Sequence, residues 1–154
     1  MEFTEKQQSI VRDILVKNGV NLAYIFGSHS RGTAGSLSDL DIAIVFNDAV
    51  SRADYFDTEL TVVREISEAI RKEVDVINIA TLEQPVLRHR AVFMGECIID
   101  ADPQRRFILE RAILREYEDT AMLRRLQREI RHRFIKQGTF GSPARSIHGK
   151  HRKA

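Results

Sequence analysis

The sequence has few of the features that would place it in an oxidising compartment or a membrane. It contains one cysteine, Cys97, which excludes an internal disulfide and fits a reducing environment. No apolar run approaches the roughly 18 residues of a membrane span, and the N-terminal residues lack the apolar core of a signal peptide. We therefore expect a soluble, cytoplasmic protein without a membrane association.

Length and charge narrow the possible function classes further. A chain of 154 residues forms one domain with one core and is too short to include a second catalytic domain. The net charge is only +2, but the segment 104–153 is rich in arginine and lysine. We interpret this segment as a solvated, salt-bridged helix face rather than a nucleic-acid surface.

The most informative stretch begins where the apolar segment 20–26 runs into Gly27 and Ser28. A glycine lets the bare backbone approach a ligand, and a serine adds a hydroxyl beside exposed N–H donors, which together suit a phosphate. Arg31 follows three residues later, and its fork of donors either binds phosphate or steadies the loop. The sequence therefore predicts a phosphate-binding loop at Gly27, Ser28 and Arg31.

Two aspartates lie at the start of the next strand-like segment, 39–46. Side chains alternate along a strand, so Asp39 and Asp41 share one face and apolar residues occupy the other. Two such carboxylates repel each other unless a hard cation lies between them, and Mg²⁺ prefers oxygen ligands and also holds substrate phosphates. Asp39 and Asp41 thus predict a magnesium site that orients a triphosphate for in-line attack.

A third acid, Asp75, interrupts the apolar segment 74–79. A carboxylate there is costly if it is buried without a partner. If this segment pairs with the strand 39–46, Asp75 faces the same cavity as the two other aspartates. Glu73 has the same parity, so the assignment is not forced, but we prefer Asp75 because its apolar neighbours place it within the strand.

The order of strand, Gly-Ser, ten-residue loop, Asp-x-Asp and strand closely resembles the nucleotidyltransferases of the DNA polymerase beta superfamily, over about residues 20–100. The small size, Gly-Ser-x-x-Arg-Gly and Ser-Asp-x-Asp are most similar to the minimal nucleotidyltransferases that act as antitoxins beside HEPN ribonuclease toxins. His29 departs from this pattern, because these proteins often have an aromatic residue there. The departure leaves the acidic residues intact.

The resemblance implies a Mg²⁺-dependent transfer of AMP from ATP to a hydroxyl, with two ions in the site. It gives Asp75 the role of the third carboxylate, which helps to hold the metal and takes the proton from the attacking hydroxyl. The acceptor implied is a tyrosine of a cognate HEPN toxin. Two alternatives stay open: adenylylation of a small molecule such as an aminoglycoside, and a non-catalytic antitoxin that acts by binding alone.

Alternating strand and helix patterns predict an α/β nucleotidyltransferase fold with a small mixed β-sheet flanked by helices. Asp102-Pro103 is a typical helix start, so a long C-terminal helix is expected over 103–137. The nucleotidyltransferase domain then spans 1–137, and 138–154 form a flexible basic tail. A helix of this length extends beyond a domain of this size, which predicts a homo- or hetero-oligomeric contact at its far end. The helix has two slightly offset apolar stripes, one of Leu123, Leu126, Ile130 and Phe134 and the other of Ile113, Leu114, Tyr117 and Ala121.

Overall fold

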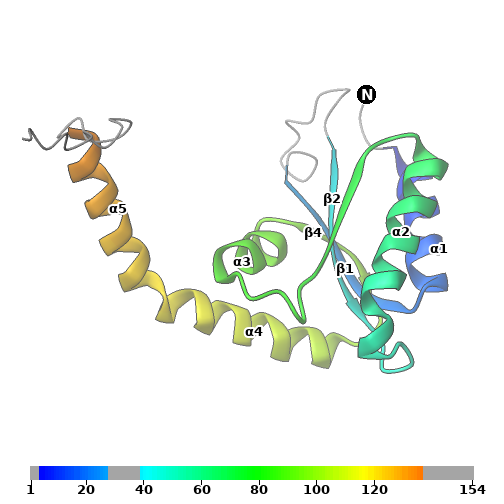
Figure 1. Ribbon diagram of the computed structural model, residues 1–154. Coiled ribbons are helices and arrows are strands. Elements are labelled where there is room, and N and C mark those ends of the chain that lie inside the picture. The colour runs from blue at the N-terminus through cyan, green and yellow to red at the C-terminus, as the bar shows by residue number, and fades with distance from the viewer. Residues whose placement is uncertain (1–3, 28–38, 137–154) are drawn as a thin grey trace, which may run out of the picture. The chain divides into compact units, whose positions relative to one another are not determined.

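The computed structural model describes residues 4–27 and 39–136 (Figure 1). The elements follow in the order α1 (Glu5–Lys17), β1 (Val20–Phe26), β2 (Leu40–Phe46), η1 (Arg52–Asp54), α2 (Tyr55–Ile70), β3 (Val74–Asn78), α3 (Pro85–Phe93), β4 (Glu96–Asp100), α4 (Pro103–Asp119) and α5 (Ala121–Lys136). The chain divides into two compact units, and the division falls between Glu118 and Asp119. The predicted α/β class is confirmed.

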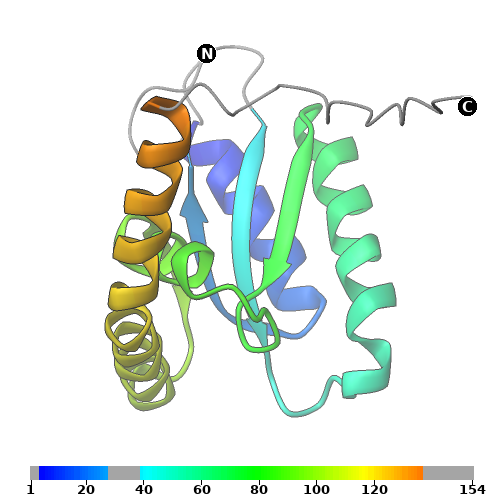
Figure 2. The ribbon, with the colours of Figure 1, turned by 60° about the vertical axis from the view of Figure 1, so that its left-hand side comes forward.

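The four strands form one mixed sheet in the order β3-β2-β1-β4. β1 runs antiparallel to both of its neighbours, whereas β2 and β3 are parallel. A parallel pair needs a crossover connection, and α2 provides it (Figure 2). β2 and β3 therefore begin at the same edge of the sheet, which is also the edge where β1 ends.

Helices cover both faces of the sheet, with α1 and α2 on one side and α3 and α4 on the other (Figure 1). Since side chains alternate along each strand, β2 contributes to two separate cores. The first core includes Val11, Leu15, Leu40, Ile42, Ile44, Val62 and Ile66. The second core includes Tyr24, Phe26, Ala43, Val45, Ala91, Val92 and Ile113.

A capping interaction fixes the start of α1. The Thr4 hydroxyl accepts a hydrogen bond from the Gln7 backbone N–H at 3.2 Å, and the Gln7 side chain accepts one from the Thr4 N–H at 3.1 Å. This reciprocal pair satisfies two backbone donors that the first helical turn leaves without partners. Thr4 and Gln7 therefore form a capping box.

The structure divides the expected helix over 103–137 into two helices. α4 ends at Asp119 and α5 begins at Ala121, with Thr120 between them. The Thr120 carbonyl accepts from the Arg124 N–H at 3.1 Å, as the residue before a new helix does. Short polar side chains such as those of Asp119 and Thr120 compete with the backbone for hydrogen bonds, which favours a helix end at this point.

Within 4–27 and 39–136, none of the helices combines the length and the apolarity that crossing a bilayer requires. The predicted tail, 138–154, lies outside the described residues, as do Ser28, His29 and Arg31 of the predicted phosphate loop.

Candidate active site

The acidic residues predicted from the sequence gather at the edge where β2 and β3 begin. Asp41 is the second residue of β2, Asp75 is the second residue of β3, and the two are direct neighbours in the parallel register. Adjacent strands lie about 4.8 Å apart. Asp39 stands immediately before β2. The condition set by the sequence, that the segment around Asp75 pairs with the segment around Asp41, is fulfilled.

The parity of each strand places Asp41 and Asp75 on the same face of the sheet. Ala43 follows Asp41 by two residues and Ile77 follows Asp75 by two, and both pack in the core beneath α3 and α4. The carboxylates therefore lie on the α3/α4 face. Asp75 is exposed and Asp41 is half-buried.

A backbone hydrogen bond holds the two strand starts together. The Leu40 N–H, between Asp39 and Asp41, donates to the Glu73 carbonyl at 2.9 Å. Glu73 itself precedes β3 and is exposed. Of the two candidates for the third carboxylate, only Asp75 is within the strand and in register with Asp41.

Gly27 follows directly on β1 and lies against Asp41. Its φ of +78° falls in the left-handed region that favours glycine. A Cβ atom at this position would lie 2.1 Å from Oδ2 of Asp41 and 3.0 Å from its Cγ. The carboxylate thus occupies the space that any other residue at position 27 would need for its side chain. Gly27, the first residue of the predicted phosphate loop, therefore contacts one member of the acidic pair.

The donor set of this edge has the chemistry that a divalent cation needs. Asp39, Asp41 and Asp75 supply hard carboxylate oxygens, the ligands that Mg²⁺ prefers. Within the described part of the chain, no three Asp, Glu, His or Cys side chains converge closely enough to form a ready metal cluster. The register brings Asp41 and Asp75 together, and the space beside Gly27 accommodates one carboxylate of the pair.

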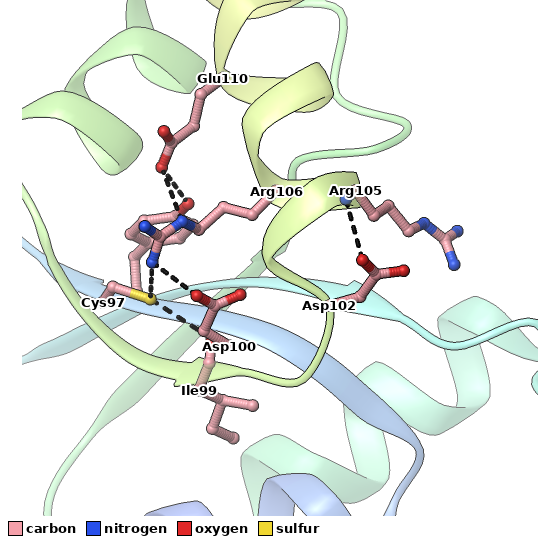
Figure 3. A network of polar contacts seen from close by, with 8 residues as sticks. Cys97, Ile99, Asp100, Asp102, Arg105, Arg106 and Glu110 are labelled. Carbon is pink, nitrogen blue, oxygen red and sulfur yellow. Dashed lines mark hydrogen bonds and ion pairs between the residues drawn. The ribbon is translucent and has the colours of Figure 1, made fainter.

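A polar network fixes α4 against the face of the sheet that carries Asp41 (Figure 3). The Tyr24 hydroxyl donates to Oε1 of Glu110 at 2.8 Å. Arg106 pairs with the same Glu110 oxygen at 3.5 Å and with Asp100 of β4 at 2.8 Å. Burial, and then the hydrogen bond to Glu110, raise the pKa of Tyr24 above its usual value.

This network could not be predicted from the sequence. Its one signal is Tyr24 itself, a hydroxyl in the middle of an apolar strand that needs a partner when buried. Cys97 lies beside the network, 3.6 Å from a guanidinium nitrogen of Arg106. Burial raises the pKa of the Cys97 thiol, so it stays protonated at neutral pH and packs as a small apolar group.

A cavity of about 280 Å³ lies between α4 and the sheet, at the other end of the strands. It is lined by Leu22 and Val45, which pair across β1 and β2, and by Arg106. Leu22 precedes Phe26, the partner of Asp41, by four residues, which is about 13 Å along a strand. This cavity is therefore separate from the carboxylate edge.

Sequence comparison gives an independent view of the same residues. The family model described as "Polymerase beta, Nucleotidyltransferase" matches residues 9–104, a range that includes all four strands and the three aspartates. A Methanocaldococcus jannaschii protein named as a protein adenylyltransferase is 34% identical over 90 residues, which are 58% of this chain and 90% of that protein.

Two solved structures with a similar fold are toxin–antitoxin complexes. A toxin–antitoxin structure with AMP-PNP contains a chain that matches with a TM-score of 0.67 and 21% identity, over 80% of this chain and 97% of that one. A structure of a tri-AMPylated Shewanella oneidensis HEPN toxin in complex with an MNT antitoxin matches with a TM-score of 0.63 and 18% identity, over 82% and 97% of the two chains. At these identities the similarity establishes the fold.

Proposed function

Because the chain belongs to the polymerase beta nucleotidyltransferase family, we propose that it transfers AMP from ATP to a hydroxyl of a partner protein. The observation that supports this most directly is the pairing of Asp41 with Asp75 beside Gly27. A nucleotidyl transfer needs carboxylates next to a backbone that can approach phosphate. These requirements meet at the edge where β2 and β3 begin.

Each residue of this edge has a distinct task in the proposed reaction. Asp39, Asp41 and Asp75 would hold two Mg²⁺ ions, whose charge would neutralise that of the phosphates and favour attack at the α-phosphorus. Gly27, Ser28 and Arg31 bind the triphosphate. The left-handed backbone of Gly27 keeps this segment clear of a Cβ where the phosphates pass the Asp41 carboxylate.

The chemical step is a single displacement at phosphorus. The Asp75 carboxylate accepts the proton of the acceptor hydroxyl, whose oxygen forms a new bond to the α-phosphorus. The bond from that phosphorus to the oxygen bridging the α- and β-phosphates breaks, and pyrophosphate leaves. The protein forms no covalent bond to the nucleotide, so the rate depends on alignment and charge.

The acceptor we propose is a tyrosine hydroxyl of a cognate HEPN toxin, which AMP transfer would silence. Two comparisons support a protein acceptor: the relative named as a protein adenylyltransferase and the neighbouring structure that holds an AMPylated HEPN toxin. The single cysteine fits the cytoplasm as the location of such a pair. The predicted oligomeric contact through the C-terminal helix is compatible with a toxin as partner.

Label transfer tests this function. The protein is incubated with Mg²⁺, the product of the adjacent gene and ATP labelled at either the α- or the γ-phosphate. Label from α-labelled ATP alone is expected on the partner protein, together with released pyrophosphate. Label on the partner from γ-labelled ATP, or a tight complex without any label, would contradict the proposal. In a parallel reaction with an aminoglycoside in place of the partner, label on the aminoglycoside would also contradict it.

The double change Asp39→Asn with Asp41→Asn tests the role of the acidic pair. We expect transfer to be abolished and the free energy of unfolding to change by less than about 1 kcal/mol, because both side chains lie at a strand start and keep their size. The matched control is Asp13→Asn with Glu68→Gln, which removes the same charge from exposed positions of α1 and α2. Unchanged transfer in the first variant would exclude the proposed metal site.

A further inference from the structure

α5 is an amphipathic helix that presents a continuous line of exposed apolar side chains. None of its described residues is buried. The line, which we call the α5 stripe, is 44% to 60% exposed and consists of Leu123, Leu126, Ile130 and Phe134. Apolar side chains in such a row typically mark a contact surface.

The α5 stripe is narrow. Spacings of three, four and four residues keep its members within about 80° of one another around the helix axis. Two further exposed apolar residues, Met122 and Ile135, are separated from the stripe in this projection by Arg133 and Arg131. A helix that lies in a bilayer surface presents a broad, uninterrupted apolar face, whereas a narrow stripe fits a groove or a neighbouring helix.

The charges of α5 argue against pairing with a second copy of the chain. α5 has six basic side chains and one acidic side chain, Glu129. In a pair of identical helices the arginines bordering the two stripes would face each other, and like charges at such contacts are destabilising. The apolar stripe also lacks the polar groups that would read nucleic acid. Both considerations favour a different protein with acidic residues beside an apolar groove.

We propose that α5 is the docking element for the protein whose hydroxyl the active site modifies, and that its stripe enters an apolar groove with an acidic rim on that partner. This inference rests on the proposed function and names how the acceptor is recruited. A docked partner presents its hydroxyl at an effective concentration in the millimolar range. Recognition and chemistry then reside in different compact units, since α5 lies beyond the division at Asp119.

Binding measurements with the full-length protein and the adjacent gene product test this inference. Leu126→Glu and Ile130→Glu place a carboxylate in the stripe with a residue that favours helices, and each is expected to weaken the complex at least 100-fold. The matched control, His132→Glu, places the same group on the opposite side of α5 and is expected to change affinity less than about three-fold. Wild-type affinity is expected to fall when salt rises, because the rim contacts are electrostatic.

The readouts separate a failure of docking from a failure of catalysis. Leu126→Glu is expected to retain ATP binding and to lose transfer to the partner, whereas Asp39→Asn with Asp41→Asn retains the complex and loses transfer. Undiminished partner binding by Leu126→Glu would overturn the docking role and leave the transfer proposal standing. Absence of a wild-type complex, a homodimer that Leu126→Glu dissociates, or stripe-dependent binding to phosphatidylglycerol vesicles would also overturn it.

Discussion

Replacing Gly27 by alanine is expected to lower the activity of the proposed site strongly while the protein stays folded. The new Cβ would lie 2.1 Å from Oδ2 of Asp41, while ordinary contacts need roughly 3.4 Å. The carboxylate therefore has to retreat by about 1.3 Å, or the backbone has to move by a similar distance. A displacement of about 1 Å in a reacting group costs on the order of 100-fold in rate. We expect Gly27→Ala to lower AMP transfer about 100-fold.

Gly27→Ala is also expected to lower the free energy of unfolding, and a second glycine of the chain, Gly19, provides a control for this effect. A residue with a Cβ at φ +78° costs about 1–2 kcal/mol, and the crowding adds to this. Gly19 has almost the same φ, +80°, and a Cβ there would lie 2.5 Å from a methyl carbon of Val50. Gly19 directly precedes β1, at the end of that strand away from Gly27. Gly19→Ala is thus a matched control for strain and crowding without effect on the carboxylates.

The assay compares both variants by urea denaturation and by transfer rate at a temperature where each is folded. We expect both to lose about 1–3 kcal/mol of unfolding free energy and only Gly27→Ala to lose activity beyond three-fold. Equal transfer rates in the two variants would show that the contact between Gly27 and Asp41 does not position a reacting group. The geometric basis of the proposed site would then be refuted.

Three further comparisons test individual side chains. Asp75→Asn is expected to lower transfer by about 10²- to 10⁴-fold as a general base is lost, whereas Glu73→Gln changes it little; the reverse result would make Glu73 the third carboxylate. Tyr24 has a raised pKa, so the folded state keeps a proton that the unfolded state releases, and stability falls as pH rises above about 10. Tyr24→Phe should lower the free energy of unfolding by about 1 kcal/mol at neutral pH. In denaturant titrations at about pH 7 and about pH 10.5, this free energy should fall less between the two pH values in Tyr24→Phe than in the wild-type protein. Arg106→Ala breaks two ion pairs and should lower the free energy of unfolding by about 2 kcal/mol in the same titrations. Arg105→Ala breaks one exposed ion pair and should lower it by less than about 0.5 kcal/mol. Equal losses in the two variants would contradict the role of the network in fixing α4 against the sheet.

Local features of the fold were predictable because short-range chemistry determines them. The capping box at Thr4 fixes the start of α1, and the apolar run Val20–Phe26 coincides with β1. The end of α4 was not anticipated, since the apolar spacing continues through Thr120 into α5. There the preference of polar side chains for helix ends outweighs a periodic pattern that alone predicts an unbroken helix.

Contacts between residues far apart in the sequence could be predicted only on the condition that particular strands pair. The sequence shows that Asp75 shares a face with Asp41 if their strands pair, but register depends on contacts between distant segments. The structure supplies that register directly. Gly27 illustrates the same dependence on distant contacts. The sequence indicates a position where bare backbone can approach a ligand, but the contact of Gly27 with Asp41 appears only in the structure.

Polar groups within apolar strands explain why some of these residues could be read from the sequence and others could not. A carboxylate is tolerated at a strand start, where water reaches it, so Asp75 is exposed although Val74 before it is buried. Tyr24 lies in mid-strand and is 2% exposed, so its hydroxyl requires a partner inside the protein, and Glu110 provides it from 86 positions away. An acid at a strand start therefore indicates a site from its position alone. A buried hydroxyl indicates only that a partner exists, and the fold has to identify which residue it is.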